Sequence, residues 1–113
     1  MNTPARTVGP PIDIAAGDWA DVVRILREQV PNLEVWAFGS RAKHTAKQYS
    51  DLDLVLITQQ PLSLDQWAAL NDAFATSDLP IRVDLVDWAR ASEAFRKRIE
   101  QDAVVVQPAV AAC

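Results

Sequence analysis

Two aspartates separated by one residue follow a glycine–serine pair along the chain, and their spacing suits nucleotide chemistry. Gly39 and Ser40 end one hydrophobic segment, and Asp51 and Asp53 open the next. Side chains alternate faces along a strand, so the two aspartates point the same way, with Cα atoms roughly 6.5 to 7 Å apart. Two carboxylates at that spacing can hold a divalent cation. A Gly-Ser pair at the start of a helix offers backbone N–H groups to phosphates.

A third carboxylate, Asp84, lies in a later segment whose neighbours are largely apolar. Three carboxylates in one place repel each other unless a cation neutralises them. Mg²⁺ suits such a site because it prefers oxygen ligands and leaves positions for water and substrate phosphates. Two ions about 3.5 to 4 Å apart can clamp the entering and leaving oxygens of an in-line displacement. We expect Asp51, Asp53 and Asp84 to bind metal and to be catalytic, with Asp84 completing the second site or accepting a proton from the attacking hydroxyl.

Four residues around the glycine are candidates for holding the nucleotide's phosphates. Gly39 lets phosphates approach where a side chain would block them, and Ser40 supplies a hydroxyl and a backbone N–H. Arg41 and Lys43 can neutralise a pyrophosphate leaving group. The alternatives remain open: a Gly-Ser turn can simply close a strand and cap a helix, and the two cations can be solvated helix residues. The segment lacks the Walker pattern, and the single histidine, His44, is interpreted as a loop residue.

These residues need a frame of alternating strands and helices to bring them together. Hydrophobic spacing predicts that Leu52, Leu54 and Leu56 face the core, opposite the carboxylates. We expect an α/β fold with a small mixed β-sheet flanked by helices. The expected strands are residues 33–38, 51–58, 81–86 and 104–106. The expected helices are 18–30 with Asp18 as N-cap, 40–45, 63–74 and 92–101. Ser63 and Gln66 match a capping box at the start of the third helix, in which Leu64, Trp67, Leu70 and Phe74 point inward, and Phe95 and Ile99 point inward from the fourth.

Length and composition restrict the class of protein. The chain has 113 residues, enough for one domain. We expect a flexible leader over 1–16, a folded domain over 17–107 and a tail over 108–113. A net charge of −4 argues against a general nucleic-acid binder, which would display a basic face. The single cysteine excludes an internal disulfide, and no signal-peptide or membrane-spanning stretch is evident, so we expect a cytoplasmic protein.

Two segments together resemble the signature of a known family. Residues 38–42 read Phe-Gly-Ser-Arg-Ala, and residues 50–54 read Ser-Asp-Leu-Asp-Leu. This pattern resembles the minimal nucleotidyltransferases of the polymerase-beta-like nucleotidyltransferase superfamily, and Val83-Asp84-Leu85 resembles their third carboxylate strand. The resemblance extends from about residue 18 to about residue 107. It implies a nucleotidyltransferase fold like the polymerase-beta palm and a transferase of the EC 2.7.7 type.

The chain is especially similar to the small bacterial members encoded beside a helical HEPN-type protein. That resemblance implies transfer of AMP from ATP, with Mg²⁺ and release of pyrophosphate, onto a tyrosine of the HEPN-type partner, which is a toxin, so that the nucleotidyltransferase acts as antitoxin. A hetero-oligomer is then expected. Two alternatives remain: a binding module that neutralises its partner by contact alone, and a nucleotidyltransferase acting on a small molecule. The retained carboxylates Asp51, Asp53 and Asp84 favour the enzyme.

Overall fold

The computed structural model describes residues 10–109 of the chain. Four strands form one mixed sheet in the order β3-β2-β1-β4. Strand β1 runs antiparallel to both β2 and β4, whereas β2 and β3 are parallel. The expected α/β architecture is therefore confirmed. The strands are β1 (Glu34–Phe38), β2 (Leu52–Ile57), β3 (Val83–Asp87) and β4 (Val104–Gln107), and the helices are α1 (Ala16–Gln29), α2 (Leu64–Ala75), α3 (Glu93–Asp102) and the one-turn 3₁₀ helix η1 (Trp88–Arg90).

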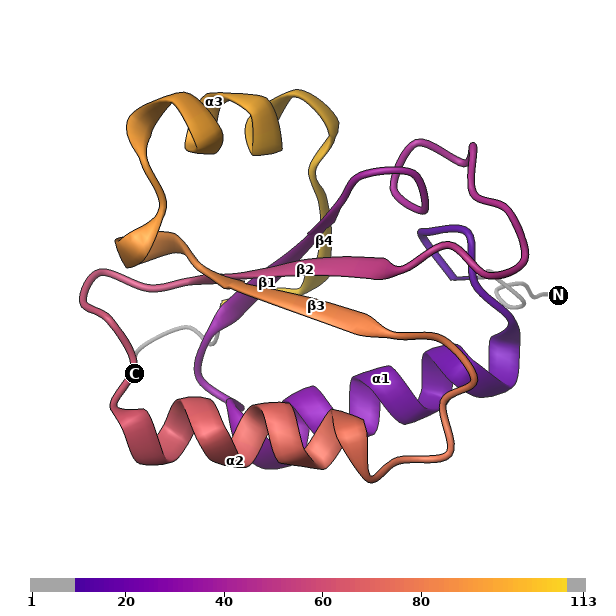
Figure 1. Ribbon diagram of the computed structural model, residues 1–113, viewed down its shortest axis with the longest axis horizontal. Coiled ribbons are helices and arrows are strands. Elements are labelled where there is room, and N and C mark those ends of the chain that lie inside the picture. The colour runs from indigo at the N-terminus through magenta and orange to yellow at the C-terminus, as the bar shows by residue number, and fades with distance from the viewer. Residues whose placement is uncertain (1–9, 110–113) are drawn as a thin grey trace, which may run out of the picture.

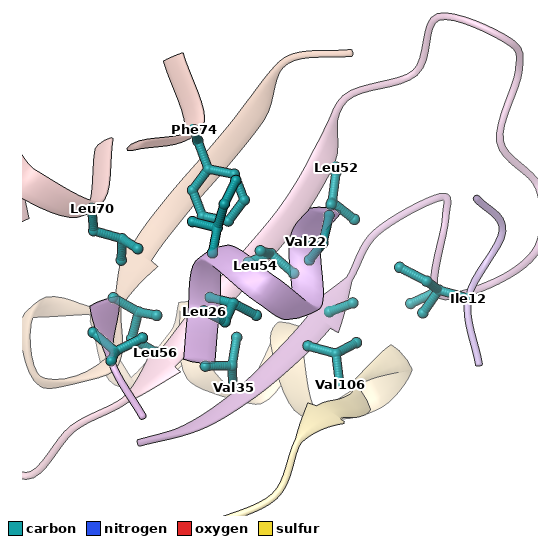
Figure 2. Packing of buried hydrophobic residues seen from close by; sticks show 14 residues of the cluster. Ile12, Val22, Leu26, Val35, Leu52, Leu54, Leu56, Leu70, Phe74 and Val106 are labelled. Carbon is teal, nitrogen blue, oxygen red and sulfur yellow. The ribbon is translucent and has the colours of Figure 1, made fainter. Parts of the chain in front are cut away.

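The helices are divided unequally between the two faces of the sheet. Helices α1 and α2 lie side by side on one face, and α3 alone lies over the other (Figure 1). The main hydrophobic core fills the space between the sheet and the α1–α2 pair (Figure 2). Leu52, Leu54 and Leu56 are fully buried there, as the alternation of β2 predicts. The side chains that meet them include Val22 and Leu26 of α1, and Leu70 and Phe74 of α2.

Helix α2 is the crossover that makes the parallel pairing of β2 and β3 possible, because parallel neighbours cannot be joined by a tight turn. It begins with the predicted capping box: the Ser63 hydroxyl accepts from the Gln66 backbone N–H, and the Gln66 side chain accepts from the Ser63 N–H. Leu70 and Phe74 point inward as expected. The expectation for Leu64 was wrong, since this first residue of the helix is 80% exposed.

The chain before α1 packs more closely than the sequence indicates. A flexible leader was expected as far as residue 16, but Ile12 is 2% exposed and belongs to the core. The backbone N–H of Asp13 also donates to the Arg41 carbonyl at 2.8 Å. Helix α1 starts at Ala16 without a side-chain cap, so Asp18 lies in the first turn and is not the N-cap. Residues 1–9 of the expected leader, and 110–113 of the expected tail, lie outside the described part of the chain.

The helix expected over residues 40–45 is instead a sequence of turns. Two backbone N–H groups, of Ala42 and Lys43, donate to the Gly39 carbonyl at 3.1 Å each, which makes one turn only. His44 then adopts a φ of 59°, a left-handed conformation that ends any helical continuation. The premise of a helix N-terminus beside Gly39 and Ser40 was therefore wrong, and phosphate binding here would depend on loop N–H groups and side chains.

Aromatic pairs attach α3 and η1 to the second face of the sheet. Trp36 of β1 meets Trp88 edge-on with ring centroids 5.4 Å apart, and Phe38 meets Phe95 of α3 at 5.9 Å. The Arg96 guanidinium donates to the Trp88 carbonyl at 2.7 and 3.0 Å, which joins α3 to η1. These contacts give both tryptophans a packing role. None of the helices among residues 10–109 is both long and apolar enough to cross a bilayer.

Candidate active site

The three predicted carboxylates lie on one face of two neighbouring strands. Asp53 of β2 and Asp84 of β3 are direct partners in the parallel register, and residues paired in this way point to the same face. Asp51 precedes β2 by one residue and lies on the side of Asp53. Leu52 and Leu54 point the opposite way, into the core. The carboxylates therefore lie on the face of α3, which covers that face only in part. The expected convergence of Asp51, Asp53 and Asp84 is therefore present.

The charges of this cluster act on each other. Partial burial raises the pKa of Asp53, and the neighbouring charges of Asp84 and Asp51 raise it further, while Arg82 opposes them. Arg82 supplies the local cation: its Nη2 lies 3.0 Å from Asp84 Oδ1 and 3.4 Å from Asp51 Oδ2. The hydrogen bond to Asp84, followed by the charge of Asp51, raises the pKa of the Arg82 guanidinium above its ordinary value. One cation is thus shared by a cluster of three acids.

Gly39 brings the turn after β1 directly against this cluster. Its φ is +77°, a conformation that side chains rarely adopt. A Cβ built on Gly39 would overlap Asp53 Oδ2 and lie 3.4 Å from Asp53 Cγ. Glycine is required here both for the backbone angle and for the close approach of the carboxylate. The pairing of Phe38 with Asp53 across β1 and β2 explains why the turn arrives at this point.

A cleft of about 360 Å³ opens beside Asp53, between the Gly39 turn and α3. Two cations, Lys43 and Arg98, line it together with the apolar rings of Phe38 and Phe95. The Lys43 Nζ lies 4.0 Å from Asp102 Oδ2, and the Lys43 side chain is half exposed. Such a mixture of cationic and aromatic side chains next to a carboxylate cluster has the chemistry required to accept a nucleotide. The full lining is Phe38, Gly39, Lys43, Asp53, Phe95, Arg98, Ile99, Gln101 and Asp102.

Arg41, a predicted phosphate ligand, is used for a different purpose. It is 6% exposed, and its guanidinium donates to backbone carbonyls: Nη1 to Asp13 at 2.7 Å, Nε to Ser50 at 3.0 Å and Nη2 to Gln48 at 3.2 Å. These bonds fasten the segment that leads into Asp51 onto the Gly39 turn. The expectation that Arg41 contacts phosphate is not supported by this geometry, and its side chain holds the loop of the site in place.

The remaining predicted residue of the turn, Ser40, follows Gly39 directly. Its carbonyl accepts from the Thr45 N–H at 2.9 Å, which closes the turn. Ser40 is therefore part of the turn that borders the cleft, while Lys43 lines the cleft itself. Of the four predicted nucleotide-binding residues, Gly39 and Lys43 border the cleft, Ser40 shapes its turn, and Arg41 faces away into the loop.

Two cations of the site were missed by reasoning from sequence, although each had a signal. Arg82 precedes Asp84 by two residues and so shares its side of the chain at β3. Arg98 lies on the same face of α3 as Phe95, Ile99 and Asp102, at the spacing i, i+3, i+4 and i+7. That stripe contains two charged residues, which indicates a helix face that borders a polar cleft. Neither arginine had a role in the sequence interpretation beyond its place on a strand or helix.

Asp87 is a carboxylate of a different kind. It is 4% exposed and ends β3, where it accepts hydrogen bonds from the Thr58 hydroxyl, the Leu62 N–H at 2.8 Å and the Ala89 N–H at 3.2 Å. Its oxygens are satisfied by the protein itself. It therefore stabilises the start of η1 and takes no part in the cluster around Asp53.

The residue types of the cluster suit a divalent cation, but two of the three carboxylates are paired with Arg82. Carboxylates are the hard oxygen ligands that Mg²⁺ prefers, and burial, followed by the charges of Asp84 and Asp51, raises the pKa of Asp53. Among the described residues, however, no three His, Cys, Asp or Glu side chains lie close enough together to hold a metal ion as they stand. Asp51 and Asp84 are instead paired with Arg82. Holding a metal would require these side chains to move.

Most of this chain is similar to known proteins. Residues 21–108 match the family described as "Polymerase beta, Nucleotidyltransferase". A Haemophilus influenzae protein named "Probable protein adenylyltransferase MntA" is 51% identical over 96 residues, which are 85% of this chain and 84% of that protein. A Methanocaldococcus jannaschii protein named "Putative protein adenylyltransferase MJ1217" is 29% identical over 84 residues, which are 74% of this chain and 85% of that protein.

One solved structure is similar in fold and partly in sequence. It is a crystal structure of a "toxin-antitoxin with AMP-PNP", in which one chain superposes with a TM-score of 0.65 and 25% sequence identity. The match covers 78% of this chain and 71% of the other. The mixed four-stranded sheet and its helices therefore have a counterpart in a complex that was crystallised with a nucleotide analogue.

Proposed function

This chain belongs to the polymerase beta nucleotidyltransferase family, and we propose that it is a metal-dependent protein adenylyltransferase that transfers AMP from ATP to a side-chain hydroxyl of a partner protein. The observation that carries the proposal is the juxtaposition of Asp53, its register partner Asp84 and the Gly39 turn. The fold brings carboxylates that can bind a cation, and a glycine turn that phosphates can approach, to the same place. Both lie beside a cleft lined in part by cationic side chains.

Asp51, Asp53 and Asp84 would hold two divalent cations, which we take to be Mg²⁺. When bound, the metal neutralises the carboxylates and polarises the phosphate oxygens of ATP. In the transfer itself, the acceptor hydroxyl oxygen forms a bond to the α-phosphorus, the bond to the pyrophosphate oxygen breaks, and the hydroxyl proton passes to Asp84. Pyrophosphate leaves with the bonding electron pair.

The cleft beside Asp53 provides for the nucleotide. Lys43 and Arg98 carry positive charge where the phosphates would lie, which favours binding of the triphosphate and departure of pyrophosphate. Gly39 admits the phosphate chain close to the backbone, and Ser40 contributes its hydroxyl and N–H at the same turn. Arg41 acts through the loop that it fastens, by fixing the segment before Asp51.

The acceptor is proposed to be a tyrosine of a helical HEPN-type toxin encoded next to this gene, with this chain acting as antitoxin in the cytoplasm, where ATP is available. The support comes from the similarity to MntA and from the structure of a toxin–antitoxin complex with AMP-PNP. The shape of the site agrees with this role, because the carboxylates are half exposed on a face that α3 covers only in part. A docked partner would exclude water there and strengthen each charge contact.

The test is to incubate the protein with ATP, MgCl₂ and the purified product of the adjacent gene, and to weigh that product by intact-protein mass spectrometry. We expect a mass gain of one or more AMP groups, mapped by peptide sequencing to tyrosine. An unmodified product whose toxicity is nevertheless neutralised would overturn the proposal in favour of inhibition by contact alone.

Matched variants assign the chemistry to the cluster. Asp51→Asn and Asp53→Asn should each reduce the transfer rate at least about 100-fold, the scale of losing one preorganised charged group at a reacting centre. Both should remain folded by circular dichroism. Asp72→Asn, which changes an exposed carboxylate on α2 in the same way, should transfer at the wild-type rate.

A further inference from the structure

Arg82 holds an unusual position for a surface arginine. Its side chain is 72% exposed, yet a single nitrogen, Nη2, lies 3.0 Å from Asp84 Oδ1, 3.2 Å from Asp84 Oδ2 and 3.4 Å from Asp51 Oδ2. Its backbone is fixed, because the Arg82 carbonyl accepts from the Leu52 N–H at 2.9 Å at the start of β2. The guanidinium is therefore exposed to solvent, while the backbone that carries it is held by a hydrogen bond to β2.

The cluster gathers three acidic side chains around one arginine. Asp53 is partly desolvated and feels the charges of Asp51 and Asp84, and Arg82 is the cation that opposes this repulsion. No three metal-binding side chains of the described region are close enough to hold an ion as they stand. Both observations have one explanation if the guanidinium occupies the place between the carboxylates that a divalent ion would take.

We propose that Arg82 is a built-in counter-ion that occupies the carboxylate cluster in the metal-free protein and competes with the divalent cation for Asp51 and Asp84. This inference rests on the metal dependence put forward under the proposed function. Binding of the metal releases the guanidinium into solvent, which its exposure permits without rearrangement of the core. Arg82 thus neutralises the carboxylates when no metal is bound, and its removal makes metal binding stronger while making the metal-free protein less stable.

An ordinary surface ion pair predicts a different result. Exposed pairs contribute little to stability, and removing the arginine would then change neither metal affinity nor the melting temperature appreciably. An arginine that orients the carboxylates for metal would give the opposite sign, since its loss would weaken metal binding. The direction of the change in affinity therefore separates the three roles.

The experiment measures binding of Mn²⁺ alone to the full chain by isothermal titration calorimetry, without nucleotide or partner. Removing one positive charge next to a doubly charged ion in a largely aqueous site should tighten binding about 5- to 20-fold for Arg82→Gln. Arg82→Lys keeps the charge but loses the planar group, so its affinity should stay closer to that of the wild type. The matched control is Arg27→Gln, which removes an exposed arginine on α1 and should leave the affinity unchanged.

Thermal unfolding gives a second readout that does not depend on activity. With EDTA present, Arg82→Gln should melt at a lower temperature than the wild type, and saturating Mn²⁺ should raise its melting temperature by more than it raises that of the wild type. Equal or weaker Mn²⁺ binding by Arg82→Gln, with clear binding by the wild type, would overturn the counter-ion role and leave the proposed function intact. Absence of Mn²⁺ binding in every variant would overturn this inference and leave the proposed function intact, because the metal of the transfer can enter bound to the triphosphate.

Discussion

The two faces of the sheet are built for different purposes from the same strands. On the face of α1 and α2, the leucines of β2 are fully buried among the side chains of two helices. On the other face, Trp88 of η1 covers the strands at Trp36 and Phe95 of α3 packs on Phe38, whereas Asp51 and Asp84 remain half exposed. Within β2, residues that alternate along the chain therefore divide between packing and chemistry.

This difference shows where the molecule can tolerate unfavourable charge. Apolar burial contributes roughly 25 cal/mol for each Å² removed from water, and the α1–α2 face provides most of that burial. Burial of Asp53 and the charges of Asp84 and Asp51, which together raise the pKa of Asp53, destabilise its charged form, and packing on the opposite side of the same strands offsets this cost. Substitutions on one face should therefore change mainly stability, and substitutions on the other mainly transfer.

The largest expected effect on stability is on the packed face. Leu54→Ala should lower the free energy of unfolding by about 2–5 kcal/mol, because it leaves a cavity beneath α1 and α2. The same substitution at Leu64, which is exposed on α2, should change it by less than about 0.5 kcal/mol. Urea titration followed by tryptophan fluorescence measures both. Similar losses at the two leucines would contradict the division between faces.

On the face that carries the carboxylates, the largest effect on transfer is expected at Gly39. Gly39→Ala forces a Cβ onto the Asp53 carboxylate and disfavours the positive φ, so transfer should fall about 100-fold or more, with a loss of about 1–2 kcal/mol in stability from the backbone alone. Gly17→Ala is the control, because nothing lies within 4 Å of the added Cβ and the residue is helical. It should gain roughly 0.5–1 kcal/mol and leave the transfer rate unchanged.

A smaller effect is expected where α2 begins. Ser63→Ala removes the hydroxyl that accepts from the Gln66 N–H, which typically costs about 1 kcal/mol. Because the cap lies on α2 and away from the carboxylates, the rate of transfer per folded molecule should not change. A rate that falls with the loss of the cap would mean that the two faces are coupled through the crossover.

The smallest effect concerns pH. The folded protein raises the pKa of Asp53 above the ordinary 3.8, so between these two values the folded state binds more protons than the unfolded state. The free energy of unfolding must then decrease as pH rises through that window. In EDTA, Asp53→Asn should remove this part of the decrease and be slightly more stable than the wild type at pH 7. Denaturation at pH 4.5 and pH 7 measures it, and an equal decrease in the variant would assign the effect to another group.

Many of the strands and helices could be predicted from hydrophobic periodicity and from capping residues. The alternation in β2 and the Ser63 capping box depend on neighbouring residues only, and the structure has both. The convergence of Asp53 and Asp84 was predicted from side-chain alternation and from the resemblance to a family. What the sequence could not supply was the pairing of β2 with β3, because register is decided by contacts across the whole α2 crossover.

The errors at the site have a common physical cause. Arg41 was expected at a phosphate because its charge is obvious in the sequence, but carbonyls of residues 13, 48 and 50 from distant turns surround it. The expected helix over 40–45 ended early, since local composition did not reveal the left-handed His44. Loop carbonyls and isolated φ angles leave no periodic signal, whereas strand and helix faces do.

The crossover between β2 and β3 has a consequence for how the protein matures. The first two acids are made early, on a strand that pairs with its predecessor, whereas Asp84 is made only after the whole of α2 and belongs to the edge strand β3. Until then the nascent polypeptide lacks its third acid and its arginine. The complete set of acidic residues is therefore present only late in synthesis, and a chain arrested within α2 would not consume ATP.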